Sequence, residues 1–313
     1  MLPGCQRRVN LAPWPASPAG QLPAAATCSI AAVDRMPPLA APARPRRGTR
    51  DRLADLAPLY DLDVAGYDAD IDLYAALAAE AGRGSRPARV LELGCGTGRV
   101  AAALAEEGHP IVAVDTSEAM LARCRERGAG LPLRCVHGDM RTLELGERFR
   151  LVLVPLGGLE HMESAEELTQ ALATVELHLA PGGLAVVDVA APQPDDLALG
   201  AQPLVEHWTR ELPAAGDSPG ALVTKLVSVE AQPAHGLRQV TWHFDVQPAG
   251  EALRRVTVRF PLRMITAGEL ELAAALAGLR VTGWHGDYTL APLDDGDERI
   301  IATLRRARRP RSQ

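Results

Sequence analysis

The sequence lacks the features that mark membrane-spanning, disulfide-stabilised and nucleic-acid-binding proteins. No apolar run approaches the ~20 residues that a membrane helix needs. The five cysteines form no Cys-x-x-Cys pair and lie at irregular spacings, which argues against a disulfide framework and against a zinc site. Lys and Arg (33) are outnumbered by Asp and Glu (39), and the net charge of −6 gives no electrostatic basis for holding a nucleic acid. We therefore expect a cytoplasmic protein in a reducing compartment, with a small-molecule partner, no nucleic acid and no membrane.

The two ends of the chain differ from its middle in composition. Residues 1–50 are rich in proline, alanine and arginine and have little periodicity, so we expect a disordered tail there. A secretory signal is disfavoured because prolines interrupt the apolar stretch after Arg8, and the functional chain is alternatively expected to begin near Met36. Residues 306–313 form a basic end that contains proline, and we interpret it as a solvated tail rather than a nucleic-acid contact.

Between these ends, strand-like and helix-like patterns alternate. The runs ARVLEL, PIVAVD and FRLVLVPL are short and continuously apolar, and helical patterns such as SEAMLARCRERG separate them. This alternation predicts an α/β fold with a Rossmann-like parallel sheet covered by helices on both faces. Ser164 with Glu167, and Thr266 with Glu269, have the spacing that caps a helix N-terminus. The stretch YDADIDLYAALAAEAG predicts one more helix, before the first strand, ending at Gly82.

The rhythm changes after the fifth strand. Residues 199–261 hold period-two stretches, and in one of them, LRQVTWHFDVQ, every second residue from Val240 to Val246 is apolar. This alternation predicts an inserted antiparallel sheet with one wet face, serving as a substrate lid, a dimer contact or both. The remaining segments, 51–198 and 262–305, are assigned to the α/β domain.

A glycine-rich loop, VLELGCGTGR, follows the first strand. Gly94, Gly96 and Gly98 have the spacing G-x-G-x-G, whereas dinucleotide sites use G-x-G-x-x-G. No lysine follows, so the loop is not a P-loop. Backbone N–H groups and a helix N-terminus converge on such a loop, which indicates a nucleotide-like ligand.

Two more strand ends carry acidic residues. Asp115 ends PIVAVD, where a carboxylate accepts hydrogen bonds from ribose hydroxyls. Asp139, in HGDM, follows the third strand, where its carboxylate and the backbone N–H of Met140 can read an adenine edge. Neighbouring strand ends line one crevice in open α/β sheets, so the ligand is expected to contain adenosine.

The segments VLELGCGTGR, VAVDTSEAML, HGDMRTLEL, FRLVLVPLGGLEHM and LHLAPGGLAVVDV together resemble the class I S-adenosylmethionine-dependent methyltransferases. The resemblance runs from about Tyr60 to Leu304. Within that superfamily the chain is similar to bacterial small-molecule enzymes, including deoxysugar and glycine-type N-methyltransferases, which carry an antiparallel sheet inserted after the fifth strand. The resemblance implies a seven-stranded sheet whose last strand is antiparallel, with S-adenosyl-L-methionine as the methyl donor.

The resemblance also implies which residues meet the cofactor. Glu92 and the glycines meet its methionine part, Asp115 its ribose, and Asp139 with Met140 its adenine. Cys95 is interpreted as a small loop residue rather than a nucleophile. The full set of expected cofactor contacts is Tyr67, Tyr74, Glu92, Gly94, Cys95, Gly96, Gly98, Asp115, Thr116, Met120, Asp139, Met140 and Leu156.

His161, in GGLEHM, is the candidate catalytic residue. It follows the fourth strand, and a histidine there suits proton removal near neutral pH, although it can equally be a hydrogen-bonding residue that shapes the loop. A free amine that binds in its neutral form needs no base. The candidate acceptor contacts are Tyr60, Glu160 for a cationic amine, Trp208, His243, and Arg263 for a carboxylate or phosphate.

We therefore predict an enzyme that transfers a methyl group from S-adenosylmethionine to a nitrogen or oxygen of a small-molecule acceptor in specialised metabolism. We also expect a homodimer. The sequence has no clustered His, Asp and Glu, so we expect no metal. The alternatives are a nicotinamide-dependent oxidoreductase and a methyltransferase-fold module that binds without catalysis.

Overall fold

The computed structural model describes residues 51, 53–82, 86–197, 200–201, 203–214 and 219–307. The predicted tail at residues 1–50, and all but the first two residues of the predicted C-terminal tail, lie outside this range. Within it, no helix is long and apolar enough to cross a membrane.

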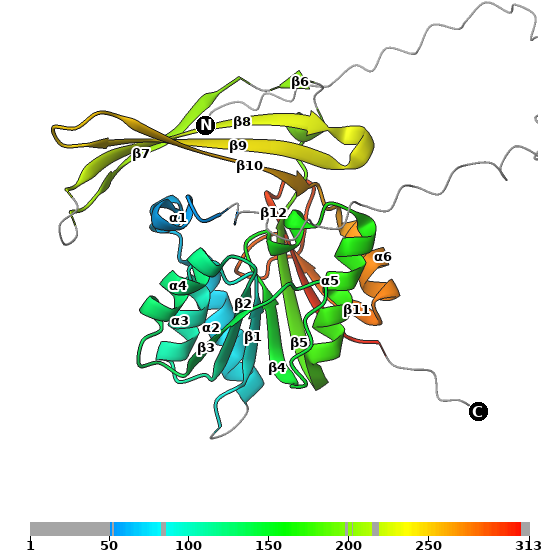
Figure 1. The fold of residues 1–313 in the computed structure, drawn as a ribbon. Coiled ribbons are helices and arrows are strands. Elements are labelled where there is room, and N and C mark those ends of the chain that lie inside the picture. The colour runs from blue at the N-terminus through cyan, green and yellow to red at the C-terminus, as the bar shows by residue number, and fades with distance from the viewer. Residues whose placement is uncertain are drawn as a thin grey trace, which may run out of the picture. The chain divides into compact units, whose positions relative to one another are not determined.

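A seven-stranded sheet forms the base of the fold, in the order β11-β12-β5-β4-β1-β2-β3 (Figure 1). Its strands are β1 (Val90–Leu93), β2 (Ile111–Asp115), β3 (Leu133–His137), β4 (Phe149–Val154), β5 (Leu179–Ala190), β11 (Leu279–His285) and β12 (Arg299–Arg306). Strands β1 to β5 pair in parallel, whereas β12 runs antiparallel to both β5 and β11. The predicted Rossmann-like sheet with an antiparallel last strand is therefore confirmed.

Helices cover both faces of this sheet. They are α2 (Ala69–Gly82), α3 (Arg99–Glu106), α4 (Glu118–Arg127), α5 (Ala165–His178) and α6 (Ala267–Leu276). One apolar cluster joins α2, α3 and α4 to alternate strand residues, including Val90, and a second cluster joins α5 and α6 to the intervening ones, including Leu91. The predicted caps are present, because Ser164 accepts a hydrogen bond from the Glu167 amide and Thr266 accepts one from the Glu269 amide.

A second sheet, here called the lid sheet, is antiparallel throughout, in the order β10-β9-β8-β6 with β7 also paired to β8. Its strands are β6 (Gly200–Ala201), β7 (Val205–Leu212), β8 (Ala221–Gln232), β9 (Leu237–Pro248) and β10 (Arg254–Arg263). The apolar face predicted from Val240 to Val246 packs on a short helix, α1 (Ala57–Asp63), and on Met120 of α4. The lid sheet thus lies across the end of the first sheet, with α1 between them (Figure 1).

Candidate active site

The glycine loop between β1 and α3 has a backbone that other residues rarely adopt. Gly94, Gly96 and Gly98 have φ values of 75°, 53° and 79°, in the left-handed region that favours glycine. The Gly96 amide donates to Asp115 Oδ2 at 2.8 Å, and the Ser117 amide donates to Oδ1 of the same carboxylate at 2.8 Å. Asp115 therefore fixes the loop against the end of β2.

Asp115 keeps unused hydrogen-bonding capacity. The carboxylate accepts backbone hydrogen bonds from Gly96, Ser117 and Thr116, and an ionised carboxylate has about four acceptor positions. Burial raises the pKa of Asp115, while the Ser117 and Gly96 amides oppose that rise. A ligand hydroxyl at the remaining acceptor positions would stabilise the ionised form.

Glu92 is buried at 2% exposure near the end of β1. In the described part of the chain its Oε2 atom has no hydrogen-bond partner. Burial raises the pKa of this carboxyl well above its usual range. Since an unpaired buried carboxylate is costly, this position fits a bound amino group, such as that of the methionine part of S-adenosylmethionine.

Two side chains close over the glycine loop. A Cβ atom built on Gly96 would lie 3.6 Å from Cε1 of Tyr60, and one built on Gly94 would lie 3.2 Å from Cε of Met140. Tyr60, on α1, is half-buried, and burial raises its pKa to about 12. Tyr60, Met140, Glu92 and Asp115 thus lie around the loop, and the cofactor and acceptor contacts expected of them stay predictions.

Asp139 and Thr116 lie beside these residues but already have partners. The Asp139 carboxylate forms an ion pair with Arg141, whose Nε lies 3.0 Å from both oxygens, and Arg141 also pairs with Glu167. The Thr116 carbonyl oxygen lies 2.9 Å from His137 Nε2. The adenine-reading role of Asp139 and Met140 stays a prediction, and it requires the Asp139 pair with Arg141 to leave an acceptor position free.

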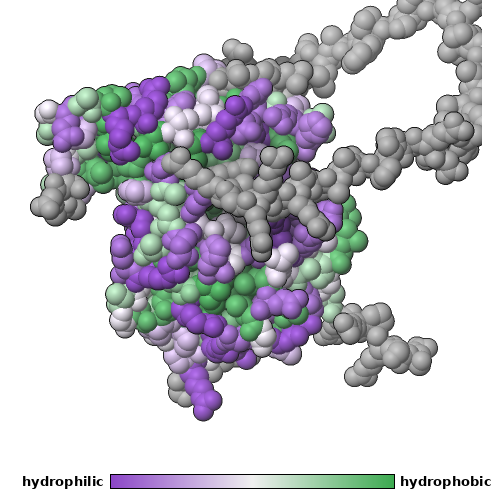
Figure 2. Space-filling model, viewed as in Figure 1, coloured by the Kyte–Doolittle hydropathy of each residue, from purple (hydrophilic) through white to green (hydrophobic). Residues whose placement is uncertain are grey.

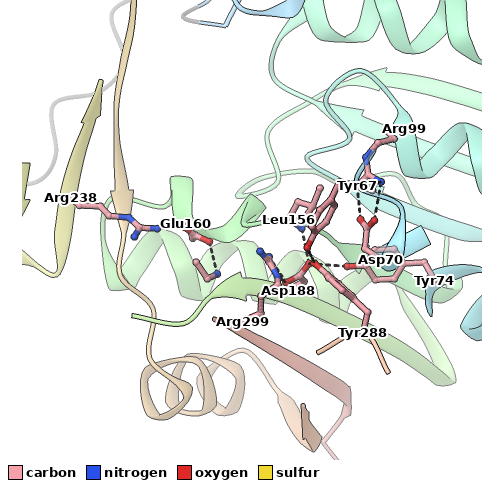
Figure 3. A network of polar contacts seen from close by, with 11 residues as sticks. Tyr67, Asp70, Tyr74, Arg99, Leu156, Glu160, Asp188, Arg238, Tyr288 and Arg299 are labelled. Atoms are coloured by element: carbon pink, nitrogen blue, oxygen red, sulfur yellow. Dashed lines mark hydrogen bonds and ion pairs between the residues drawn. The ribbon is translucent and has the colours of Figure 1, made fainter. Parts of the chain in front are cut away.

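The hydroxyls of Tyr74 and Tyr67 already have hydrogen-bond partners, and the cofactor contacts expected of these two residues stay predictions. Tyr74 is completely buried, and its hydroxyl donates to Asp188 Oδ2 at 3.2 Å. The Tyr67 hydroxyl donates to the Tyr288 hydroxyl at 3.0 Å, and that hydroxyl donates in turn to Asp188 at 2.7 Å. Figure 3 shows these tyrosines converging on Asp188, with Arg299 on its other side. Tyr74 therefore belongs to a buried polar network around Asp188.

The same network determines the backbone after β4. Leu156 has φ 46°, which is strained for a residue with a side chain, and its amide donates to Asp188 Oδ2 at 3.2 Å. The family resemblance implied a contact of Leu156 with the cofactor. Because the Leu156 N–H group is already hydrogen-bonded to Asp188, its carbonyl oxygen is the backbone atom left for such a contact.

Glu160 and His161 lie in η2 (Gly158–His161), and they differ in what they can do. Glu160 is buried, accepts from the Ala190 amide at 2.8 Å, and forms an ion pair with Arg238 of β9 at 3.0 Å (Figure 3). It joins the lid sheet to the core and is not free to bind a cationic amine, which corrects that expectation. His161 is exposed, its ring lies 5.6 Å from that of Phe260 on β10, and desolvation by surrounding protein lowers its pKa.

The inner face of the lid sheet carries a buried cation among aromatic rings. Lys225 is 3% exposed, and its Nζ lies 2.7 and 2.6 Å from the two carboxylate oxygens of Asp63. The same Nζ lies 3.8 Å from the ring centroid of Trp242, which packs edge-on against Phe260 at 4.8 Å. Trp208 Nε1 also donates to Asp63, at 2.8 Å. Trp208 is therefore on the face that meets α1, as an acceptor-lining role requires.

Several other predicted residues lie away from this face or are committed elsewhere. His243 lies on the opposite face of the lid sheet, where its Nδ1 is 2.7 Å from Thr257 Oγ1, so it does not reach the site. Arg263 is paired through Nε to Glu269 of α6 at 2.8 Å and is not free for a substrate anion. Met120 packs into the core beneath the lid sheet. Cys95 is 6% exposed, with its thiol directed toward Cys124.

Sequence reasoning missed most of the charged partners described above. Arg99 follows the glycine loop directly, and its guanidinium pairs with the completely buried Asp70 of α2 (Figure 3). Lys225 had a signal, since it is a lone cation in the apolar alternation of ALVTKLVSVE. For Asp188, the only sequence signal was an acidic residue near the end of a buried strand.

The chain is similar to known methyltransferases in sequence. The model of a family described as a methyltransferase domain matches residues 90–183. The dTDP-3-amino-3,4,6-trideoxy-alpha-D-glucopyranose N,N-dimethyltransferase of Streptomyces venezuelae is 28% identical over 240 residues, covering 74% of this chain and 93% of that protein. The cypemycin N-terminal methyltransferase of a Streptomyces species is 30% identical over 217 residues, covering 69% of this chain and 82% of that protein.

Solved structures share the fold. The CcbJ methyltransferase from Streptomyces caelestis matches with a TM-score of 0.64 and 27% identity, covering 82% of this chain and 97% of that one. A S-adenosylmethionine-dependent methyltransferase from Clostridium acetobutylicum matches with a TM-score of 0.65 and 20% identity, covering 80% and 98%.

Proposed function

We propose that this chain, which belongs to the class I S-adenosylmethionine-dependent methyltransferases, methylates an amino nitrogen of a small molecule of specialised metabolism. Membership of the family excludes the alternative of a nicotinamide-dependent oxidoreductase. The choice of nitrogen over oxygen is supported by the names of both relatives described above, since one is an N,N-dimethyltransferase and the other an N-terminal methyltransferase.

The cofactor-facing residues fit S-adenosylmethionine in charge and in space. In the proposed arrangement, Glu92 and the glycine loop hold the methionine part, Asp115 holds the ribose, and Asp139 with Met140 meets the adenine. When bound, S-adenosylmethionine supplies a methyl group that its sulfonium makes electrophilic. The task left to the protein is to align the acceptor nitrogen and to exclude water.

The position and the lowered pKa of His161 are the observations on which the proposed chemistry rests. It lies against Phe260 of the lid sheet, is exposed, and has a lowered pKa, so its imidazole is neutral at pH 7. An alkylammonium acceptor must lose a proton before its nitrogen lone pair can attack, and a neutral imidazole can take that proton. The acceptor is proposed to lie between Tyr60 on α1 and the rings of Trp242 and Phe260.

A turnover screen tests this proposal. Purified protein is incubated with S-adenosylmethionine and matched sets of aminosugars, peptide amines and phenols, and mass spectrometry follows the gain of a methyl group. We expect methylation of amines and none of phenols. Turnover of phenols alone would refute the nitrogen assignment. Binding of S-adenosylhomocysteine without turnover of any acceptor would support the alternative of a non-catalytic binding module.

Self-association and a cytoplasmic location are further parts of the proposal. Figure 2 shows hydrophobic residues at the surface of the lid sheet near β7, where Val205 and Leu222 are 55% and 48% exposed. Such a surface supports a homodimer through the lid sheet. Light scattering coupled to size-exclusion chromatography gives the oligomeric state directly.

A further inference from the structure

Three thiols from different elements meet directly beneath the cofactor loop. Cys95 lies in the glycine loop, Cys124 on α4 and Cys135 on β3, and all three are free. The Cys135 thiol donates to Cys124 Sγ across 3.2 Å, and the Cys95 thiol also hydrogen-bonds to Cys124. Cys124 is completely buried, whereas Cys135 is partly exposed. This group, the thiol cluster, is connected to solvent through Cys135.

The sulfur of Cys124 supports the backbone of the glycine loop. A Cβ atom built on Gly98 would lie only 2.4 Å from Cys124 Sγ and 3.0 Å from its Cβ. Gly98 is also the N-cap of α3, with φ 79°. Because no side chain separates this backbone from the sulfur, a displacement of Cys124 is transmitted to the loop.

The chemistry of the cluster makes Cys124 the reactive member. Hydrogen bonds from Cys95 and Cys135, together with the charge of Arg127, lower the pKa of Cys124 to about 7. A substantial fraction of this thiol is therefore thiolate at neutral pH, and the thiolate is the nucleophile in disulfide formation. Burial and the hydrogen bond to Cys124 raise the pKa of Cys135 to about 12, so Cys135 stays a thiol.

We propose that Cys124 and Cys135 are a redox modification site, at which hydrogen peroxide converts two thiols into a disulfide that weakens cofactor binding. The two thiols lose two protons and two electrons to form the S–S bond, and the peroxide is reduced to two water molecules. A disulfide needs the sulfurs at about 2.05 Å, so they must approach by roughly 1.1 Å from their present separation. That movement shifts Cys124 against Gly98 and disturbs the loop that binds the methionine part of the cofactor.

The test uses the full chain, with peroxide as the oxidant and dithiothreitol as the reductant. After mild oxidation, peptide mapping by mass spectrometry should find a cross-link between the peptides that contain Cys124 and Cys135. Calorimetry should show about tenfold weaker binding of S-adenosylhomocysteine, equivalent to ~1.4 kcal/mol, and dithiothreitol should restore it.

Variants distinguish the effect of a disulfide between Cys124 and Cys135 from the effects of oxidation at other residues. Cys135→Ser should bind S-adenosylhomocysteine normally and lose the response to peroxide. Cys5→Ser/Cys28→Ser, which leaves the thiol cluster intact, should keep the full response. The proposal is overturned if no such cross-link forms, if the cross-link forms without loss of affinity, or if Cys135→Ser remains sensitive to peroxide.

Discussion

Glu92 carries the clearest residue-scale signature of a bound cation. Its carboxyl is buried with one oxygen unpartnered among the described residues, and burial raises its pKa well above the usual range. In the ligand-free protein this carboxyl therefore keeps its proton to a higher pH than a free glutamate does. An ammonium group placed beside it favours the ionised form and lowers the pKa again.

Binding of S-adenosylhomocysteine should consequently release a proton. Calorimetry in buffers of different ionisation enthalpy measures this release, which should be largest between the pKa values of the free and the ligand-bound carboxyl and absent in Glu92→Gln. Affinity should also fall in that variant, because an amide cannot neutralise the ammonium charge. Unchanged proton release in Glu92→Gln would assign the proton to another group and contradict the role of Glu92.

Asp115 combines two tasks, holding the glycine loop through the Gly96 amide and offering free acceptor positions. Asp115→Ala should reduce the affinity for S-adenosylhomocysteine by at least about a hundredfold, since it removes roughly two charge-assisted hydrogen bonds to a ligand and releases the loop. Isothermal titration checks this. Asp245→Ala, on the outer face of the lid sheet, serves as the control and should bind normally.

His161 is expected to act on turnover alone. His161→Ala should lower kcat by about a hundredfold or more while leaving the affinity for S-adenosylhomocysteine unchanged. Because desolvation lowers the pKa of His161, the loss of wild-type kcat/KM on the acid side should occur below the usual histidine value of about 6.5. Full activity of His161→Ala would contradict a role as a base and would support the alternative, in which His161 shapes the loop.

At the scale of elements, α1 is the connection between the cofactor loop and the lid sheet. Asp61 accepts from Thr97 Oγ1 of the loop at 2.6 Å, while Asp63 binds Lys225 and Trp208 of the lid sheet. Tyr60 of the same helix lies against Gly96. A buried ion pair is seldom more stable than apolar packing, so we attribute this one to the placement of α1 rather than to stability as such.

Lys225→Met removes the cation and leaves the Asp63 carboxylate buried beside aromatic rings. The free energy of unfolding should fall by about 3 kcal/mol, because breaking one partner of a buried pair uncovers an uncompensated charge. S-adenosylhomocysteine should also bind less tightly, although Lys225 does not touch the cofactor loop. Denaturant unfolding and calorimetry measure the two effects.

Arg255→Met is the matched control for this change. Arg255 pairs with Asp245 on the solvent face of the same sheet and has no contact with α1. The Arg255→Met variant should leave both the free energy of unfolding and the cofactor affinity unchanged. Equal effects of the two variants would refute a special role for α1.

Elements were predictable where their signal is local. The parallel strands, the caps at Ser164 and Thr266, and the alternation of the lid sheet follow from the periodicity of neighbouring residues. The same periodicity could not assign Tyr74, because a tyrosine on the buried face of α2 looks alike whether its hydroxyl meets a ligand or Asp188.

At the scale of the whole molecule, ion pairs join the lid sheet to the core. Arg238 of β9 pairs with Glu160 and with Asp196, and Arg263 of β10 pairs with Glu269. The Glu160–Arg238 pair adjoins His161, so it aligns the lid sheet over the proposed acceptor position rather than over the cofactor.

Arg238→Met should therefore affect the acceptor more than the cofactor. We expect KM for the acceptor to rise about tenfold, as loss of uniform binding predicts, with little change in the affinity for S-adenosylhomocysteine. Arg259→Met, which breaks the exposed pair with Glu230, is the control and should leave both unchanged. A loss of cofactor affinity in Arg238→Met would instead indicate a general disturbance of the fold.

The sequence by itself determined the sheet, its order of helices and strands, and the glycine loop, because each rests on contiguous residues with a recognisable spacing. The resemblance that these segments carry implied the methyl donor. Only the tertiary structure decided which charges are paired and which sulfurs meet. Lys225 and Asp63 are separated by 162 positions, and Tyr74 and Asp188 by 114. Cys95, Cys124 and Cys135 come from a loop, a helix and a strand, and their irregular spacing predicted no association. Pairings of this kind depend on how distant elements pack, and local periodicity contains no information about that.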